Sequence, residues 1–258
     1  MFIEERHQEI LNIVKEQGRI SIGEIQEKFD VSVDSARRDL RILEEKTLLK
    51  RTHGGAIPII QVGLHGPKKG SVSQMAVVHE NYDSIAKRAV EFIKPNDVVY
   101  ITSGSIGYLM LKYLPSNIEF TVVTNSIDNA SELRGYDNIT VYMVGGKMKQ
   151  NGRIVDSFAN EFVKNMRFDV SFLTGAGFSA GFGASNGTPE TAAFQRVIAE
   201  NTRQNIAVFP NEKIGFDSFI KDVDATKFDV LITDWDAVED ELSKIEDLGV
   251  KVIVVNKK

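Results

Sequence analysis

The sequence contains no cysteine among its 258 residues, which excludes disulfides, thiolate metal sites and cysteine nucleophiles. It also lacks an apolar run long enough to span a membrane, and its first residues, MFIEERHQEI, are too charged for a signal peptide. We therefore expect a cytoplasmic protein that does not associate with membranes. The histidines lack ligand spacing, so neither a metal site nor a cofactor is expected; they are His7, His53, His65 and His79, and His7 lies on an apolar helix face and is expected to be structural.

The charge of the chain is unevenly distributed. The net charge of −5 does not by itself favour a nucleic-acid partner. Residues 1–34 hold four Lys or Arg and eight Asp or Glu, whereas residues 35–57 hold six and three. A local basic excess of this kind can contact phosphates while the rest of the chain stays acidic. With 42% hydrophobic residues, the chain can bury one large core or two modest ones.

The stretch VSVDSARRDLRILEEK, residues 31–46, repeats its apolar residues at helical spacing. Its arginines, Arg37, Arg38 and Arg41, lie off that apolar face or at its margin. One interpretation is a solvated helix face with local ion pairs, and the other is a helix that binds a polyanion. The acidic residues available for local pairing are Asp39, Glu44 and Glu45, and the apolar face consists of Val33, Ala36, Leu40 and Leu43.

The flanking sequence favours the second interpretation. Upstream, an apolar stripe predicts a helix ending at Gly18, and Ser21 and Glu24 have the spacing of a capping box that starts a second helix. Ser32 is a suitable N-cap for the arginine-rich helix. Downstream, LLKRTHGGAIPI alternates around a Gly-Gly turn, as a small β-hairpin does. Three short helices followed by a hairpin predict a winged helix-turn-helix.

In such a unit the third helix enters the major groove of DNA and presents its N-terminal outer residues to base edges. An arginine there can bind guanine bidentately or contact a phosphate, and the sequence leaves both possibilities open. The hairpin would contact the DNA backbone or the minor groove. The predicted DNA-binding residues are Ser32, Asp34, Ser35, Arg37, Arg38 and Arg41 on the helix and Lys50, Arg51 and His53 on the hairpin.

The segment from RHQEIL to RTHGG resembles the N-terminal region of DeoR-family bacterial transcriptional regulators. The run Ser35-Ala36-Arg37-Arg38-Asp39-Leu40, preceded by Ser32, is similar to the family signature, with Ser35 where threonine is usual. The resemblance extends over roughly the whole chain. It implies a sequence-specific regulator that binds double-stranded operator DNA, and in particular a repressor of carbohydrate metabolism genes.

The remaining sequence predicts a second, larger domain of the α/β class. We expect a DNA-binding domain over residues 1–57, a linker over 58–78 and an effector-sensing and oligomerisation domain over 79–258. Apolar runs alternate with helical stretches, which indicates a mostly parallel sheet covered on both faces. The expected strands are Val98–Thr102, Phe120–Thr124, Thr140–Val144, Val170–Thr174, Asn205–Phe209, Val230–Thr233 and Val250–Val255, and the expected helices are 79–93, Ile106–Leu114, Ile127–Leu133, Phe158–Asn165, Glu190–Asn201 and Ala237–Asp247.

Polar and glycine-rich turns follow several of these strands, where ligands bind in parallel sheets. The Ser103-Gly104-Ser105 turn could hold a phosphate at a helix start, although ordinary serine-capped turns look the same. Lys213 is the better candidate cation; Lys147 alone reads as a solvated lysine, and Glu190 could bind sugar hydroxyls or only favour the helix dipole. The predicted effector-binding residues are Ser103, Gly104, Ser105, Thr124, Asn125, Gly145, Lys147, Gly175, Glu190 and Lys213.

The order of these turns resembles the DeoR-type sensor domain, which shares its fold with ribose-5-phosphate isomerase and recognises phosphorylated sugars or related metabolites. The family usually has an aspartate at the positions of Thr102 and Gly177. The loss of both carboxylates removes acceptors for sugar hydroxyls. Either the effector differs from the commoner sugar phosphates, or the site binds weakly or not at all.

Two alternatives remain open beside the regulator. A sugar-phosphate isomerase would need a carboxylate base, for which only Glu190 and Asp156 are present as weak substitutes, so we do not expect an enzyme. The sensor domain could also have lost its ligand. Because one winged helix covers a short DNA site, we further expect a homo-oligomer, either a dimer or a tetramer.

Overall fold

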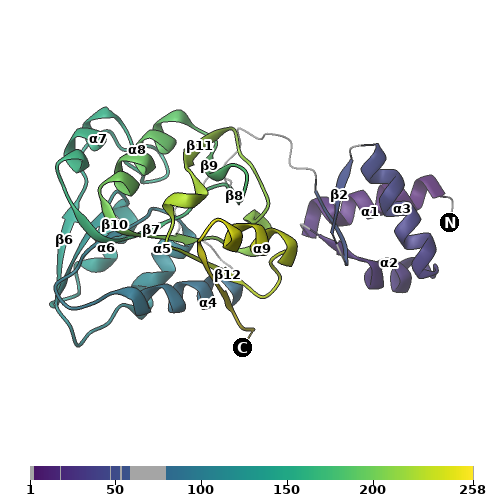
Figure 1. The fold of residues 1–258 in the computed structure, drawn as a ribbon, viewed down its shortest axis with the longest axis horizontal. Helices are drawn as coiled ribbons and strands as arrows, with labels where there is room; N and C mark the ends of the chain where they lie inside the picture. The colour runs from purple at the N-terminus through teal and green to yellow at the C-terminus, as the bar shows by residue number, and fades with distance from the viewer. Residues whose placement is uncertain (1–2, 18, 47, 53, 59–79, 258) are drawn as a thin grey trace. The chain divides into compact units, whose positions relative to one another are not determined.

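The computed structural model describes residues 3–17, 19–46, 48–52, 54–58 and 80–257. The chain divides into two compact units, Met1–Gln61 and Val62–Lys258, which are described separately here. Figure 1 shows the elements of each unit. Most of the expected linker, the expected helix end at Gly18 and the hairpin residue His53 lie outside the described residues. The domain boundaries at 57/58 and 78/79 therefore stay predictions.

The N-terminal unit contains the three helices and the hairpin that the sequence predicts. The side chain of Ser21 accepts a hydrogen bond from the Glu24 amide at 3.1 Å, and the Glu24 carboxylate accepts one from the Ser21 amide at 2.6 Å, which completes the capping box. Asp30, with φ of 50°, ends this helix in the left-handed conformation. The elements are α1 (Ile3–Gln17), α2 (Ile22–Phe29), α3 (Val33–Glu45), β2 (Leu49–Thr52) and β3 (Gly55–Pro58).

A short strand, β1 (Ile20–Ser21), was not expected from the sequence. It pairs antiparallel with β3, so that the small sheet has the order β1-β3-β2. A Cβ atom at Gly55 would lie 1.9 Å from the carbonyl oxygen of Ile20, so only glycine permits this approach. The three helices and this sheet enclose one core that includes Ile10, Ile25 and Leu40.

The larger unit is built on a seven-stranded sheet with the order β13-β12-β10-β7-β4-β5-β6. Every pair of neighbours in this sheet is parallel. The expected α/β class is therefore confirmed, and all seven expected strands are present within a few residues of their expected bounds. They are β4 (Val98–Ile101), β5 (Phe120–Thr124), β6 (Ile139–Met143), β7 (Phe168–Leu173), β10 (Thr202–Val208), β12 (Val230–Asp234) and β13 (Lys251–Val255).

Helices cover both faces of this sheet, as Figure 1 shows. Val99 and Ile101 of β4 point into one core and Tyr100 between them into the other, because successive side chains of a strand alternate. One core receives side chains from α4 (Glu80–Ala89), α5 (Ser105–Met110) and α6 (Ile127–Leu133). The other receives them from α7 (Ser157–Lys164), α8 (Pro189–Glu200) and α9 (Glu239–Asp247).

A second small sheet in this unit was missed by the sequence analysis. It has the order β11-β9-β8 and is antiparallel. Its strands are short and contain mostly small or polar residues, so they carry little periodic apolar signal. They are β8 (Gly177–Ser179), β9 (Gly183–Asn186) and β11 (Ile220–Val223).

Candidate functional site

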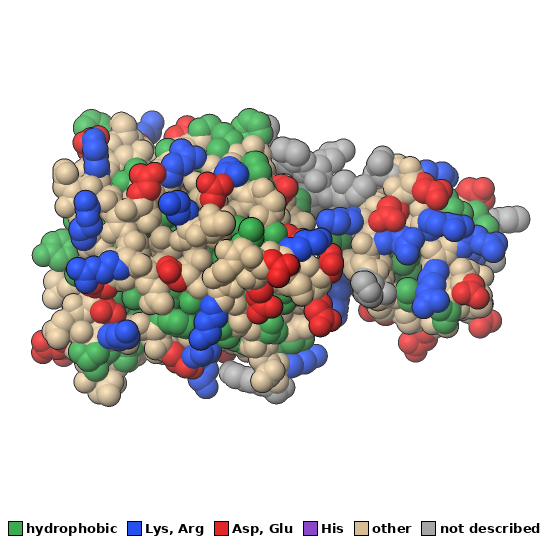
Figure 2. All heavy atoms as spheres, viewed as in Figure 1, with side chains coloured by type: hydrophobic (Ala, Val, Ile, Leu, Met, Phe, Trp, Pro, Cys, Tyr) green, Lys and Arg blue, Asp and Glu red, His purple; other side chains and the backbone are tan. Residues whose placement is uncertain are grey.

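The arginines of α3 lie on the surface of the N-terminal unit. Arg37, Arg38 and Arg41 are exposed, whereas Ala36, Leu40 and Leu43 are buried against the core. In Figure 2 blue Lys and Arg side chains are prominent on the visible face of this unit, with acidic side chains among them.

The ion pairs of these arginines are loose. The Arg37 guanidinium lies 4.0 Å from Asp34 and the Arg41 guanidinium 3.9 Å from Glu45, and both arginine side chains are about 60% exposed. Exposed pairs of this kind contribute about 0–1 kcal/mol. The arginines can therefore leave these partners for a phosphate or a base at little cost.

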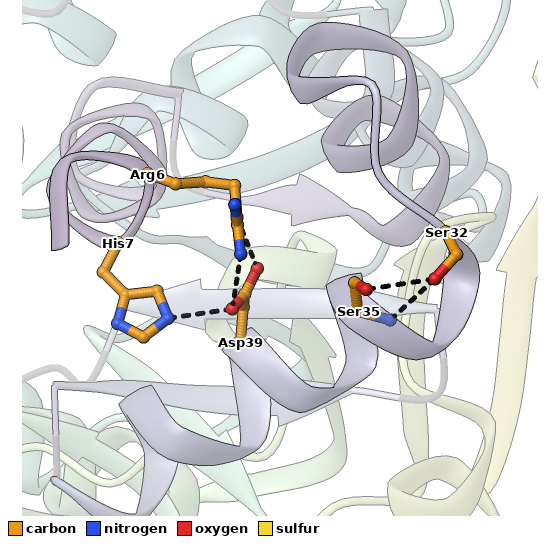
Figure 3. A network of polar contacts seen from close by, with 5 residues as sticks. All are labelled: Arg6, His7, Ser32, Ser35 and Asp39. Atoms are coloured by element: carbon orange, nitrogen blue, oxygen red, sulfur yellow. Dashed lines mark hydrogen bonds and ion pairs between the residues drawn. The ribbon is translucent and has the colours of Figure 1, made fainter. Parts of the chain in front are cut away.

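Asp39 does not pair with the arginines of its own helix, so this one part of the solvated-face interpretation is wrong. It is 1% exposed and faces α1. Arg6 Nε donates to Asp39 Oδ2 at 2.7 Å, Arg6 Nη2 lies 3.2 Å from Oδ1, and His7 Nε2 lies 3.0 Å from Oδ1 (Figure 3). His7 is buried in this network, which agrees with the structural role expected for it.

The Arg6–His7–Asp39 network fixes α3 against α1. Burial alone would raise the pKa of Asp39, but the hydrogen bonds and charges of Arg6 and His7 outweigh burial and hold that pKa below its ordinary value. The hydrogen bond to Asp39 likewise raises the pKa of Arg6. Asp39 thus stays charged and locks the helix from its inner face while the arginines project from the outer face.

Ser32 and Ser35, which the sequence places among the DNA-binding residues, form the start of α3. The Ser35 amide donates to Ser32 Oγ at 3.2 Å, and the two hydroxyl oxygens lie 3.0 Å apart (Figure 3). Ser32 therefore acts as the N-cap that the sequence predicts. Any contact of these hydroxyls with DNA stays a prediction.

The hairpin is joined to α3 by Arg51. Its amide donates to Glu44 Oε1 at 2.9 Å, and its guanidinium lies 3.8 Å from Glu44 Oε2. Lys50 and Arg51 are both exposed. Asp34, also a predicted DNA-binding residue, has a side chain that is 92% exposed at the first turn of α3. The hairpin and the first turn of α3 thus both present charged groups to solvent.

In the larger unit the strand order reverses between β4 and β7. The chain passes from β4 to β5 and β6 on one side and from β7 to β10, β12 and β13 on the other. Ligands of open parallel sheets bind at such a reversal, beyond the carboxyl ends of the strands. A Cβ atom at Gly104 would lie 3.2 Å from Thr174 Cγ2, so the turns after β4 and β7 are in close contact.

The turn after β4 has the strand–turn–helix geometry that the sequence predicts. Thr102 and Ser103 are buried, and α5 begins at Ser105. A Cβ atom at Gly107 would lie 2.1 Å from the Thr102 carbonyl oxygen, so the helix starts tightly against the strand end. The α-helix is shorter than expected, because it ends at Met110 and a 3₁₀ turn, η3 (Leu111–Tyr113), follows.

Lys213 and Gly175, two of the predicted effector-binding residues, lie together. Lys213 Nζ donates to the Gly175 carbonyl oxygen at 2.9 Å. Burial lowers the pKa of Lys213 to about 8, and the nearby Arg153 lowers it further while Glu212 opposes the shift. A lysine in these surroundings gains from a bound anion.

Thr124 and Asn125 are buried at the end of β5 and hydrogen-bond to the protein. Thr124 Oγ1 donates to the Ile101 carbonyl oxygen at 2.9 Å. Asn125 accepts from the Tyr100 hydroxyl at 2.9 Å and donates to the Ile154 carbonyl oxygen at 3.0 Å. Both residues therefore shape the site by holding neighbouring segments together.

Gly145, Lys147 and Glu190 lie at the surface instead. The Lys147 amide donates to Asp156 Oδ2 at 2.9 Å, and the Glu190 carboxylate lies 3.6 Å from Lys149 Nζ. A hydrogen bond from its own amide, at the start of α8, lowers the pKa of Glu190, as does Lys149. This geometry fits the helix-dipole alternative for Glu190 better than contact with a sugar.

Arg153 is the residue that the sequence analysis missed at this site. It lies in the loop between β6 and α7, and a Cβ atom at Gly104 would lie 3.8 Å from Arg153 Nη2. Burial lowers the pKa of its guanidinium. The segment NGRIVD carries no motif that predicts this position, which arises from the pairing of Arg153 with Ser126 across the fold.

Two further features concern metals and membranes. Within the described ranges, no group of three or more His, Cys, Asp or Glu side chains could hold a metal ion. None of the helices in those ranges is long and apolar enough to cross a membrane.

Two family models match the chain. A DeoR-like helix-turn-helix domain matches residues 6–61, and a DeoR C-terminal sensor domain matches residues 78–235. The second model alone covers more than half of the sequence.

Curated relatives match over nearly their full lengths. The HTH-type transcriptional repressor GlcR of Bacillus subtilis is 30% identical over 236 residues, covering 91% of this chain and 89% of the relative. The HTH-type transcriptional regulator GolR of Listeria innocua is 27% identical, with 98% of each chain covered. The glycerol-3-phosphate regulon repressor of Escherichia coli is 27% identical, with 89% of this chain and 90% of the relative covered.

Solved structures match part of the chain. Ribose 5-phosphate isomerase A from Methanocaldococcus jannaschii is 14% identical with a TM-score of 0.38, covering 52% of this chain and 53% of that one. The eIF2B beta subunit from Chaetomium thermophilum is 14% identical with a TM-score of 0.42, covering 59% and 48%.

Proposed function

The chain belongs to the DeoR family of DNA-binding transcriptional regulators, and on that premise we propose that α3 reads the operator while the larger unit senses a phosphorylated small molecule. The action we propose is repression, because relatives such as GlcR and the glycerol-3-phosphate regulon repressor are named as repressors. These names also support a regulatory rather than an enzymatic role.

The observation that carries the DNA-binding proposal is the division of α3 into two faces. Its inner face is fixed by Asp39 and by buried apolar residues, and its outer face presents Arg37, Arg38 and Arg41 with only weak local ion pairs. A helix held rigidly from behind can place arginines on base edges with little further loss of conformational freedom. We propose that Arg37 and Arg38 contact the operator in the major groove, with Lys50 and Arg51 on its backbone.

The test is the Arg37→Ala/Arg38→Ala double variant. We expect it to lose specific operator binding, at about 1–3 kcal/mol for each base contact, while its circular dichroism and thermal unfolding stay unchanged. Operator fragments selected from genomic DNA with the wild-type protein would be titrated by fluorescence anisotropy. Arg203→Ala, which removes an arginine side chain that is 84% exposed on the larger unit, is the control. Undiminished operator affinity of the double variant would show that α3 is not the reading helix.

The effector proposal rests on the turn after β4 and the cations beside it. The Ser103-Gly104-Ser105 turn and Arg153 adjoin each other, and Lys213 reaches the neighbouring turn after β7. Backbone amides, hydroxyls and cations together suit a phosphate dianion better than a neutral sugar. The name of the glycerol-3-phosphate regulon repressor agrees with a phosphorylated effector.

Thermal-shift measurements with a panel of phosphorylated small molecules test the effector proposal. A binder should also change operator affinity by a coupling of about 1–3 kcal/mol. Gly104→Val should remove both responses yet leave ligand-free DNA binding nearly unchanged, because a side chain there meets Thr174 and Arg153. A phosphorylated effector whose binding survives both Gly104→Val and Lys213→Ala would overturn the assignment of this site.

The chain is also proposed to act as a homo-oligomer assembled through the larger unit. One winged helix covers a short site, whereas specific binding within a genome needs more contacts than one module provides. Sedimentation of the full chain at micromolar concentration should therefore show a dimer or a tetramer. A monomer with full operator affinity would contradict this proposal.

A further inference from the structure

The loop between β6 and α7 places Arg153 beside the turn after β4 by means of its backbone. The Ile154 amide donates to the Asn125 carbonyl oxygen at 3.0 Å, and the Ile127 amide donates to the Gly152 carbonyl oxygen at 3.1 Å. These bonds flank Arg153 on both sides and tie it to the end of β5 and the start of α6. Its position is thus fixed independently of any ion pair.

Arg153 and Lys213 form a pair of shielded cations without a counterion. Among the described residues, no carboxylate lies within ion-pair distance of either side chain. The Arg153 guanidinium donates no hydrogen bond to any described residue, and only the Arg153 backbone amide does, to Asn151 Oδ1 at 3.3 Å. Lys213 has one hydrogen bond, to the Gly175 carbonyl oxygen. Shielded cations that lack a partner cost folding free energy, because the water that solvated them is removed and no opposite charge takes its place.

Two acidic residues close in sequence to this pair, Asp156 and Glu212, already have partners. Asp156 accepts from the Lys147 and Ala159 amides at 2.9 and 3.0 Å. Glu212 accepts from the Tyr82 hydroxyl at 2.5 Å and acts on Lys213 only from a distance. Neither of these two carboxylates therefore forms an ion pair with Arg153 or Lys213.

Two positions near this pair, Asn125 and Gly177, lack a free acceptor for a sugar hydroxyl. The amide of Asn125 uses both its oxygen and its nitrogen within the protein. A Cβ atom at Gly177 would lie 2.3 Å from the Phe216 carbonyl oxygen, so the backbone packing excludes a carboxylate side chain there. The site thus offers donors and positive charge, while Asn125 and Gly177 provide no free acceptor for a hydroxyl.

We infer that the ligand of this site is a small phosphorylated acid, whose phosphate binds the Ser103–Ser105 turn and Arg153 and whose carboxylate binds Lys213. This inference rests on the proposed function and narrows its effector to a molecule with two anionic groups. The planar fork of an arginine matches phosphate oxygens bidentately, and a lysine ammonium suits a single carboxylate. A ligand with two anionic groups would place one beside each shielded cation. A sugar phosphate, in which the phosphate is the only anionic group, would not.

Two probes of similar size test whether the site prefers a ligand that carries a carboxylate in addition to its phosphate. 3-Phosphoglycerate and glycerol 3-phosphate share a three-carbon phosphate skeleton and differ in a carboxylate against a hydroxymethyl group. Isothermal titration of the full chain should give an affinity for 3-phosphoglycerate at least tenfold higher. Equal affinities, or a preference for glycerol 3-phosphate, would overturn the inference while leaving the phosphate site intact. Failure of both probes and of inorganic phosphate to bind would overturn the proposed effector site as well.

Variants of Lys213 and Arg153 test which anionic group of the ligand each side chain binds. Lys213→Met should bring the ratio of the two affinities to about one, whereas Arg153→Gln should weaken both probes and preserve the ratio. Lys213→Arg, which keeps the charge, should retain a preference for the acid. Lys164→Met, at a 62% exposed side chain on α7, is the matched control. A ratio that survives Lys213→Met, with the variant folded by circular dichroism, would show that Lys213 does not bind the carboxylate.

Discussion

The two units hold the cations of their proposed binding sites in opposite ways. The arginines of α3 extend into solvent, with side chains about 60% exposed and carboxylates no closer than 3.9 Å at Arg37 and Arg41. Arg153 and Lys213 lie at the edge of a buried sheet, where burial lowers the pKa of each. The exposed arginines cost the protein little folding free energy and attract anions at long range. The shielded cations lower the stability of the fold and attract anions only at short range.

This difference suits two kinds of anion. A DNA duplex is an extended array of phosphates, and exposed cations bind it by displacing its counterions. A small metabolite offers one or two charges, and it must be distinguished from many similar molecules by enclosed groups. Arg6 is a third case, because it is partly buried and paired with its own carboxylate, Asp39, within the fold.

The largest expected contrast is in the response to salt. Raising the salt concentration from about 50 to about 200 mM should reduce operator affinity by about 10³-fold or more, as for proteins that contact six or more phosphates. Ligand binding at Arg153 and Lys213 should fall by less than about tenfold, because shielded charges are screened less. Both can be measured on one preparation by anisotropy and calorimetry. If operator affinity and the affinity for the small ligand depended equally on salt, the distinction between the exposed arginines of α3 and the shielded Arg153 and Lys213 would be wrong.

Asp39→Ala should produce the next largest effect. It leaves the partly buried Arg6 without its carboxylate, and we expect the N-terminal unit to lose about 3 kcal/mol of stability. Hydrogen exchange of the α1 and α3 amides in the full chain would report this loss. Asp34→Ala, at a 92% exposed side chain, should change the same exchange by less than about 0.5 kcal/mol.

The same carboxylate predicts acid sensitivity. Because the folded state holds the pKa of Asp39 below its ordinary value, its stabilisation is present above that value and is lost as pH falls through the folded pKa. The amides of α1 and α3 in the wild type should therefore lose protection in acid, and Asp39→Ala should lack this part of the pH dependence.

Lys213→Met should stabilise the ligand-free larger unit by about 1–2 kcal/mol, well below what the full pKa shift implies, because part of the side chain reaches water. The folded pKa of Lys213, about 8, lies below its ordinary 10.5, so unfolding takes up a proton between these values. The stability of the wild type should therefore rise with pH across that window, and the variant should lack the rise. Denaturant titration at pH 7 and pH 10 would show whether the two proteins converge.

The smallest effect is expected for Glu45→Ala. It removes the carboxylate 3.9 Å from Arg41 and should change the free energy of unfolding by less than about 0.5 kcal/mol. Operator affinity should stay the same or rise slightly, since one negative charge near the DNA is lost. A marked loss of stability would mean that the surface pairs of α3 are structural after all.

The sequence alone predicts those helices, strands and turns whose capping residues or apolar pattern lie within one short segment of the chain. Ser21 and Glu24 define a helix start within four residues, and each strand of the main sheet contains a short, mostly apolar stretch. The turn at Ser103–Ser105 was identifiable because its strand and its helix adjoin it. Local periodicity and capping chemistry determine such features before any tertiary contact forms.

Features that depend on distant residues were not predictable in this way. Asp39 reads as a partner for neighbouring arginines, yet it pairs with Arg6, which lies 33 residues earlier. Arg153 has no motif around it and reaches the site only because its loop crosses the end of β5. The strands of the small sheet are too short and polar to show a period.

The reversal of strand order between β4 and β7 also bears on protein synthesis. Val99 pairs with Val170, so the centre of the sheet can close only after the ribosome has completed β4, β5 and β6 and then β7, and Lys213 emerges later still. The N-terminal unit, with its own core, is complete by Gln61. Domains fold as units during translation, the N-terminal one first. A prematurely terminated chain would therefore contain a folded N-terminal unit but lack the larger unit through which the proposed oligomer assembles, and it should bind operator sites only weakly.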